Sequence, residues 1–418
     1  MATYDLTGSE LKSLLLSDNI SPAITQSIID YLKDDGLLTT HKSKVAVQES
    51  GFPPLDSSAQ VLLVDTAHAT VATDSHLKVI VDVADATLRV TGHNNILVAG
   101  GDGNDRFDLR GTSGRDEVLV GSGNDTILGG AGADTIVAGD GNDLIRSGDG
   151  NRNLIHVGDG NDVLRAGNGN WDTIIAGSGN DFIRLGNGNH DLVKVGDGND
   201  VLRAGNGNGD IVRAGDGNDF IHFGNGNNDS IKAGDGNDTI IAGNGNHDTI
   251  TAGDGNDTVI AGNGNHDKVT VGDGNDWIQA GNGNLDTITA GAGNDTIFAG
   301  DGYRDAIFAG GGNDRIYGGA GNNQLLDGGA GNDTMFAGTG NESLVGGTGN
   351  DMFHIGRSGN DTINGGSGQD TVTFNDSIWN AHFGHHAGTT TITFTDTGQS
   401  MTVSNVEELV FTDKTIPI

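Results

Sequence analysis

From about residue 100 onward, short groups of apolar residues return along the chain at nearly constant intervals. Each group follows an aspartate and reads x-U-x-Ala or x-U-x-Val, where U is aliphatic, as in Thr239–Ala242 and Val201–Ala204. This alternation predicts a short β-strand whose U and Ala side chains point inward while their neighbours point outward. Gly-x-Gly-Asn segments separate the strands and allow the backbone conformations of tight turns.

The turns have two alternating forms, Gly-Asp-Gly-Asn-Asp, as at 253–257, and Gly-Asn-Gly-Asn-x-Asp, as at 243–248. Aspartates that end turns of the same form recur every 19 residues, through steps of nine and ten. Two strands and two turns therefore make one coil of 19 residues. We predict an all-β solenoid, a parallel β-roll of about 14 stacked coils over residues 100–373.

Composition limits what such a chain can do. Its 418 residues include 73 glycines, and hydrophobic residues make up only 34%, so only a thin core shared between stacked units is available. The net charge of −35 argues against nucleic-acid partners, and no 18-residue apolar stretch suits a membrane span. There is no cysteine, so disulfides and thiolate metal sites are excluded. The acidic balance fits either a disordered chain or a carboxylate array that needs metal, and the regular spacing favours the array.

The turns resemble the glycine-rich nonapeptide of the repeats-in-toxin (RTX) family, Gly-Gly-x-Gly-x-Asp-x-U-x, which residues 100–107 and 129–136 match. The resemblance implies a parallel β-roll with several bound Ca²⁺ ions. Each ion is then held by the final aspartate of a turn and by turn carbonyls from adjacent coils. Hard oxygen donors suit calcium, and stacked carboxylates would repel one another without an ion. We therefore expect the chain to fold only when calcium binds.

The candidate calcium ligands are the aspartates that end the turns. On the nine-residue edge they are Asp105, Asp125, Asp143, Asp162, Asp181, Asp200, Asp219, Asp238, Asp257, Asp276, Asp295, Asp314, Asp333 and Asp351. The ten-residue edge departs from the family pattern by an extra residue before the aspartate, and Asn153 and Asn323 replace the aspartate there. Its candidates are Asp172, Asp191, Asp210, Asp229, Asp248, Asp267, Asp286 and Asp305. On this edge, side-chain-to-backbone hydrogen bonds of the asparagines are an equal alternative to calcium. Three of the extra residues are histidines, His190, His247 and His266. We expect them to be solvated loop residues and not a metal-binding column.

Both ends differ from the repeats. Residues 1–44 predict a small helical cap or assembly element, in which Ser21-Pro22 begins a helix. Residues 45–99 predict irregular β-coils without calcium. Residues 374–418 predict a β cap.

The C-terminal segment also carries an export hypothesis. Residues 403–413 resemble the uncleaved C-terminal signal of RTX proteins that leave the cell by type I secretion, although a capping strand pair would look similar. The segment Met1–Leu16 lacks a basic region followed by an apolar run. We therefore expect export without an N-terminal signal peptide, to the extracellular space or cell surface.

No His-Glu-x-x-His or Gly-x-Ser-x-Gly motif is present, so we do not expect an enzyme. Outward positions of one sheet carry apolar and basic residues, and we predict a contact face of Phe182, Phe220, Arg165, Arg184 and Arg203. An exposed apolar ladder marks an interaction surface, whereas ordinary cross-strand pairing is the simpler alternative. The face predicts self-association into a homopolymer, such as a surface layer or filament, with cell-surface polysaccharide as a further partner.

Two other functions are compatible with the sequence. One is calcium-dependent ice binding or an adhesin-type module, since a family of ice-binding adhesins has similar 19-residue coils with threonine in the turn. This chain has hydrated aspartates there, such as Asp197 and Asp216, which disfavour an ordered plane of water. The other is a soluble secreted calcium-binding effector.

Overall fold

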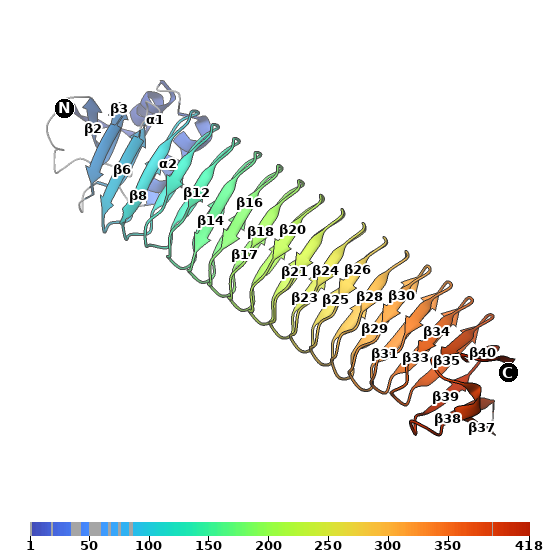
Figure 1. Cartoon of the computed structure of the whole chain (residues 1–418). Coiled ribbons are helices and arrows are strands. Elements are labelled where there is room, and N and C mark those ends of the chain that lie inside the picture. Colours follow the sequence, from blue (N-terminus) through green and yellow to red (C-terminus); the bar gives the residue numbers. More distant parts are fainter. Residues whose placement is uncertain are drawn as a thin grey trace. The chain divides into compact units, whose positions relative to one another are not determined.

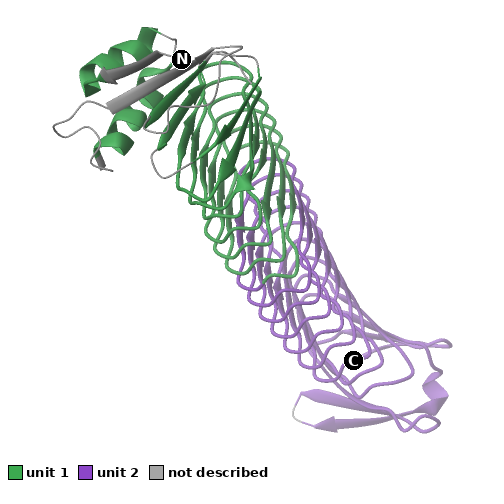
Figure 2. Ribbon diagram, turned by 90° about the vertical axis from the view of Figure 1, so that its left-hand side faces the viewer, with its two compact units in different colours: residues 1–207 green, residues 208–418 purple. Residues whose placement is uncertain are grey.

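The computed structural model shows a parallel β-solenoid of about 16 turns, two short N-terminal helices and a β C-terminal region. The described residues are 2–17, 20–34, 43–49, 60–65, 68–73, 77–82, 87–386 and 388–418. The chain divides into two compact units, Met1–Gly207 and Asn208–Ile418, shown in Figure 2. The turn count exceeds the expected 14 because strands before residue 100 also pair in parallel as coils.

Unit 1 consists mainly of two stacks of parallel strands, here called sheet A and sheet B (Figure 1). Sheet A contains β1 (Ala2–Leu6), β2 (Ser43–Glu49), β3 (Val61–Asp65), β5 (Val79–Asp82), β7 (Leu97–Ala99), β9 (Glu117–Leu119), β11 (Thr135–Val137), β13 (Leu154–His156), β15 (Thr173–Ile175) and β17 (Leu192–Lys194). Sheet B contains β4 (His68–Ala72), β6 (Thr87–Gly92), β8 (Arg106–Thr112), β10 (Thr126–Leu128), β12 (Leu144–Arg146), β14 (Val163–Gly167), β16 (Phe182–Leu185) and β18 (Val201–Arg203).

Unit 2 repeats this arrangement. Its sheet A contains β19 (Ile211–Arg213), β21 (Ser230–Lys232), β23 (Thr249–Thr251), β25 (Lys268–Thr270), β27 (Thr287–Thr289), β29 (Ala306–Gly311), β31 (Leu325–Ala330), β33 (Ser343–Thr348), β35 (Thr362–Ser367) and β39 (Ser400–Ser404). Its sheet B contains β20 (Phe220–His222), β22 (Thr239–Ile241), β24 (Thr258–Ile260), β26 (Trp277–Gln279), β28 (Thr296–Phe298), β30 (Arg315–Tyr317), β32 (Thr334–Phe336), β34 (Met352–Ile355), β36 (Thr371–Phe374) and β40 (Glu408–Val410).

The interior of each coil is narrow and aliphatic. In sheet B of unit 2, Ile240 pairs with Val259 and Val259 with Ile278, and all three are fully buried. Ala242, two residues after Ile240, is also buried, whereas Ile241 between them is only half-buried. The predicted alternation of inward U and Ala is therefore confirmed. Each coil buries too little apolar surface to be stable alone, so it depends on its neighbours above and below.

The N-terminal helices α1 (Gly8–Ser17) and α2 (Pro22–Asp34) begin with side-chain caps. Thr7 and Glu10 form a reciprocal capping box, with the Thr7 N–H donating to Glu10 Oε2 at 2.7 Å and the Glu10 N–H to Thr7 Oγ1 at 3.3 Å. Ser21 Oγ accepts the N–H of Ile24 at 3.3 Å, which confirms the start predicted at Ser21-Pro22. No described helix combines the length and apolar character needed to span a membrane.

The helices cover the outer face of the first strands of sheet A. Their buried side chains form one cluster with the outward residues of β3, β5, β7 and β9: Leu11, Leu15, Ile20, Ile24, Ile28, Ile29, Leu32, Val61, Leu63, Val79, Val81, Leu97, Ala99 and Leu119. A strand with apolar residues on both faces needs such a cover. The edge of this sheet is formed by β1, which pairs antiparallel with β2. The helical segment is thus a cover for a sheet face, and a strand occupies the edge.

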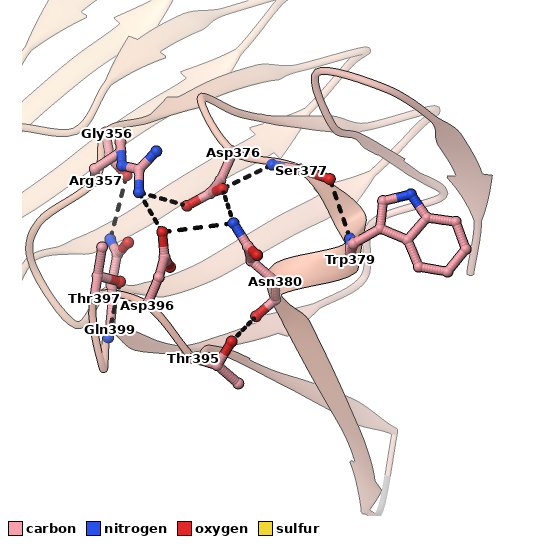
Figure 3. A network of polar contacts seen from close by, with 10 residues as sticks. All are labelled: Gly356, Arg357, Asp376, Ser377, Trp379, Asn380, Thr395, Asp396, Thr397 and Gln399. Carbon is pink, nitrogen blue, oxygen red and sulfur yellow. Dashed lines mark hydrogen bonds and ion pairs between the residues drawn. The ribbon is translucent and has the colours of Figure 1, made fainter.

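The C-terminal region ends unit 2 with antiparallel strands. β37 (Ala381–His386) pairs with β38 (Thr389–Phe394), β38 pairs with β39, and β41 (Thr415–Pro417) pairs with β40. The 3₁₀ turn η1 (Ile378–Asn380) precedes β37. Beside it, Arg357 forms ion pairs with Asp376, at 3.3 Å, and with Asp396 (Figure 3). The expected strands of the cap are therefore present.

Glycine is required where consecutive turns approach most closely. Gly255 has a φ of +144°, and a Cβ added there would overlap the carbonyl oxygen of Gly236 in the preceding coil. Overlap with a backbone atom cannot be relieved by a side-chain rotation. Side chains are therefore excluded at this position for both conformational and steric reasons.

We predict that Gly255→Ala destabilises the calcium-loaded protein by at least about 2 kcal/mol, the cost of overpacking added to an unfavourable φ. Chemical unfolding followed by circular dichroism in constant calcium measures the change. Gly384→Ala is the matched control, because nothing lies within 4 Å of a Cβ at that position. Equal midpoints for the two variants would contradict the steric explanation.

Candidate calcium sites

The residue that ends each turn is a deeply buried acid in almost every coil. The aspartates in these positions have exposed fractions between 0 and 3%. Their backbones and side chains are linked between coils. The N–H of Asp238 donates to Asp257 Oδ1 at 2.8 Å, and the N–H of Asp257 donates to Asp276 Oδ1 at 2.8 Å. One carboxylate oxygen per turn is thus used to fix the register of the stack.

The second carboxylate oxygen has no hydrogen-bond partner, although it is fully buried. This holds for Oδ2 of Asp143, Asp162, Asp172, Asp181, Asp229, Asp238, Asp248, Asp257, Asp267, Asp276, Asp286, Asp295, Asp314, Asp333, Asp351, Asp361 and Asp370. A buried charged acceptor without a partner costs several kcal/mol, so a single such oxygen would be unusual and a whole column would be prohibitive. The column therefore requires a positively charged partner.

The surrounding donors fit calcium. A Cβ on Gly283 would overlap the carbonyl oxygen of Gly264 and lie 2.7 Å from the unpaired Asp286 Oδ2, so a carbonyl oxygen of one turn and a carboxylate oxygen of the next approach the same point. Among the described residues, no three or more His, Cys, Asp or Glu side chains form a group that could hold a metal ion. A cation must therefore take most of its ligands from backbone carbonyls. Calcium accepts six to eight hard oxygens, carbonyls included, with flexible geometry.

The ten-residue edge carries the same aspartate arrangement together with an asparagine ladder. The N–H of Asp248 donates to Asp267 Oδ1 at 2.9 Å, while Oδ2 of both residues is buried and unpaired. Close by, the backbone N–H and the Nδ2 of Asn246 both donate to Asn227 Oδ1 at 2.9 Å. The hydrogen-bonded asparagines that were one alternative for this edge are therefore present. They leave the aspartates available for a cation.

The extra residue of each ten-residue turn has a left-handed backbone. Positive φ values between 60° and 65° occur at Arg152, Trp171, His190, Asn228, His247, His266, Leu285, Arg304 and Asn323. The rings of His247 and His266 stack with centroids 4.8 Å apart, and Trp171 stacks on His190 at 4.4 Å. Stacking on the turn surface accounts for these histidines without a metal.

Asn323 is one of the left-handed extra residues and does not stand at the aspartate position. The assignment of Asn323 to that position is therefore wrong, and Gln324 occupies it.

Several further acids occupy the same position as the predicted ligands. Asp116, Asp134, Glu342, Asp361 and Asp370 end turns and are buried like the others. The signal that identifies them is the coil spacing, since the N–H of Asp116 donates to Asp134 Oδ1 and that of Glu342 to Asp361 Oδ1. The nonapeptide motif also marks some of them, since Asp134 ends the match at residues 129–136.

The predicted contact face is less exposed than expected. In unit 1, Phe182 and Arg165 on the outer face of sheet B are half-buried, whereas Arg184 and Arg203 are exposed. The guanidinium carbon of Arg203 lies 6.0 Å from the centre of the Phe182 ring. In unit 2, Phe220 is half-buried and meets His222 edge-on, with centroids 6.4 Å apart. Basic side chains and apolar rings therefore share this face.

Burial changes the acidity of the turn carboxylates. The pKa of Asp257 is raised to about 7, chiefly by burial and further by the charges of Asp238, Asp276 and Asp254. The same cause raises the pKa of Asp162 and Asp286 to about 7. In the absence of metal, these carboxylates therefore bind protons more tightly in the folded state than in the unfolded chain.

This predicts an acid-stabilised metal-free state. The folded pKa values of about 6–7 exceed the ordinary aspartate pKa of 3.8, so the stabilisation by protons is complete below pH ~4 and is lost as the pH rises through 6–7. We expect metal-free protein to show more β structure by far-UV circular dichroism at pH 5.5 than at pH 7.5. A metal-free signal that does not change over this range would contradict the burial of these carboxylates.

A comparison with protein families identifies the repeats. The model of the RTX calcium-binding nonapeptide repeat matches segments 110–145, 119–154, 147–183, 194–228, 223–246, 247–265, 270–304, 301–325, 323–353 and 355–377. Together these segments cover more than half of the chain. A search of curated proteins found no match. Proteins with these repeats bind calcium and are typically secreted. The chain belongs to the family of RTX calcium-binding nonapeptide repeat proteins.

Proposed function

We propose that this protein is an extracellular, non-catalytic structural protein whose solenoid folds when it binds calcium and which then assembles with copies of itself. The observation that carries the proposal is the column of buried, unpaired carboxylate oxygens that recurs from coil to coil in both units. A cell surface or an extracellular matrix is the expected place for such an assembly.

Calcium-driven folding follows from the balance of forces in one coil. Adjacent carboxylates separated by about 4.8 Å repel by roughly 0.9 kcal/mol even in water, and by more when buried. In many strands the apolar interior offers only one aliphatic side chain and one small residue, such as Ile240 and Ala242. Since this core is too thin to offset repulsion and desolvation along the column, binding of the ion and folding of the coil become one process.

Self-assembly is supported by unpaired basic residues on a strongly acidic chain. Within the described residues, Arg146, Arg165 and Arg184 form no ion pair, and they follow one another in register on β12, β14 and β16. The exposed acids Asp140 and Asp159 of the nine-residue edge repeat with the same coil period. A second copy can therefore place these acids against the arginine column, because both sets of charges repeat with the coil period.

Ice binding is the second candidate, supported by one feature of unit 2. Thr251, Thr270 and Thr289 stack in register on the outer face of sheet A. In the neighbouring column, however, Lys268 separates Thr249 from Thr287. A flat threonine surface of three coils is small, so we place self-assembly first. Thermal hysteresis in calcium-containing solution would reverse this order.

Removal of calcium tests the first part of the proposal. At pH 7.5, we expect excess chelator to abolish most of the β signal in far-UV circular dichroism, and added calcium to restore it. Magnesium at the same concentration is the control, because its smaller ion demands a stricter octahedral geometry. A β signal that survives exhaustive chelation would show that folding does not need the metal.

Charge reversal in the arginine column tests the second part. We expect negative-stain electron microscopy to show ordered assemblies of the wild-type protein in a few millimolar calcium, and dispersed particles of the triple variant R146E, R165E and R184E. Raised ionic strength should disperse the wild-type assemblies too, since the contacts lie at the surface. The control variant K12E changes a charge on α1, outside the column. Dispersed wild-type particles, or assemblies of the triple variant, would refute self-assembly through this face.

A further inference from the structure

Gln324 stands at an aspartate position of the ten-residue edge and is completely buried. Its Nε2 donates to the carbonyl oxygens of Gly300 and Gly302, at 2.8 and 3.0 Å, and lies 3.4 Å from Asp305 Oδ2. Its Oε1 accepts the N–H of Gly319 at 3.4 Å. Two backbone carbonyls and one carboxylate thus converge on a single side-chain nitrogen.

The orientation of this carboxamide is fixed by its neighbours. If the amide were turned over, Oε1 would face two carbonyl oxygens and a carboxylate oxygen, all of which are acceptors. Only a donor or a cation is stable at that point. The preceding coil shows the alternative, because there an acid, Asp305, approaches the equivalent carbonyl of Gly283. An acid and a carbonyl side by side require a cation between them, whereas the amide supplies its own N–H groups.

A second glutamine repeats this geometry in the C-terminal region. Gln399 Nε2 donates to the carbonyl oxygens of Gly356 and Ser358, at 3.3 and 3.0 Å. Figure 3 shows Gln399 beside Gly356. Gly356 and Ser358 precede Asp361 by five and three residues, as Gly300 and Gly302 precede Asp305. Two glutamines from unrelated local sequences therefore reach equivalent pairs of turn carbonyls in different coils.

Unit 1 contains a shorter version of the substitution. Asn153 also replaces an aspartate, and its Oδ1 accepts the N–H of Asp134 at 2.9 Å, as an aspartate Oδ1 would. Its Nδ2 donates to the carbonyl oxygen of Gly150 at 2.8 Å. Along the sequence, Asn153 and Gln324 flank the uninterrupted series of eight aspartates from Asp172 to Asp305. The amides thus interrupt the row of candidate ligands on this edge, since buried acids, Asp134 and Glu342, occupy the same position in the coils beyond them.

We propose that the carboxamides of Gln324 and Gln399 take the place of calcium ions in their turns, so that these two junctions between coils are closed without metal. The proposal rests on calcium binding by the ten-residue turns. A carboxamide N–H group reaches the same carbonyl oxygens that a calcium ion would bind at about 2.3–2.6 Å, and it needs no ion to do so. Each glutamine therefore closes its own junction without an ion.

Diffraction data that use the anomalous signal of calcium test the proposal on the calcium-loaded full chain. We expect peaks next to Asp248 and Asp286, and none between Gln324 and the carbonyls of Gly300 and Gly302. In Gln324→Asp crystals we expect a new peak there. A wild-type peak coordinated by Gln324 Oε1 would overturn the proposal. It would also fall if no ten-residue turn carried calcium, because the amide would then replace nothing.

Reciprocal variants give a second measurement that needs no crystals. Native mass spectrometry counts the bound calcium ions of each chain. We expect Gln324→Asp to bind one ion more than the wild type, and Asp286→Gln, which introduces the same amide into an interior turn, to bind fewer ions. An unchanged count in folded Gln324→Asp protein would refute the substitution of amide for metal.

Discussion

Coil after coil in the described part of the repeats buries a carboxylate with only one of its two oxygens hydrogen-bonded, and the rest of the structure is arranged around that constraint. The satisfied oxygen holds the backbone of the preceding coil, as Asp257 Oδ1 holds the N–H of Asp238. The other oxygen faces the interior of the turn without a donor. Calcium resolves the conflict because it can bind the unpaired oxygen together with carbonyls of stacked turns. The same side chain thus sets the register and creates the need for the ion.

Glycine follows from the same constraint. Carbonyl oxygens can contribute to a cation site only if consecutive turns are in close contact, and in many turns a Cβ would overlap the carbonyl of the coil below, as at Gly264 above Gly245. The many glycines thus allow carbonyls to pack against carboxylates. They also raise the conformational entropy of the unfolded chain, which disfavours folding. Ion binding must offset that entropy as well, which makes folding of the central coils strongly dependent on calcium.

Much of the fold could be predicted because its period can be counted directly in the sequence. The aspartates and the U positions recur every 19 residues, and the structure pairs Ile240 with Val259 at that spacing. The packing of the helices could not be predicted, because the stripe of Ile24, Ile28 and Leu32 shows an apolar face but not which surface it covers. The half-burial of Phe182 could not be predicted from the sequence either, since it depends on the positions of neighbouring side chains such as Arg203. At Gln324, the sequence shows only the loss of an aspartate, and the carbonyl partners appear only in three dimensions.

The ends of the repeats use interactions that need no ion. At the N-terminal end, α1 and α2 bury an apolar cluster against β3, β5, β7 and β9. At the C-terminal end, the Phe374 ring lies 4.9 Å from that of Phe411 and 5.6 Å from that of Phe394. Apolar burial does not depend on calcium, so these regions are better able than the central coils to retain structure at low calcium. A chain with metal-independent ends and a metal-dependent middle can begin to fold at a preformed edge, where each new coil gains a partner and an ion together.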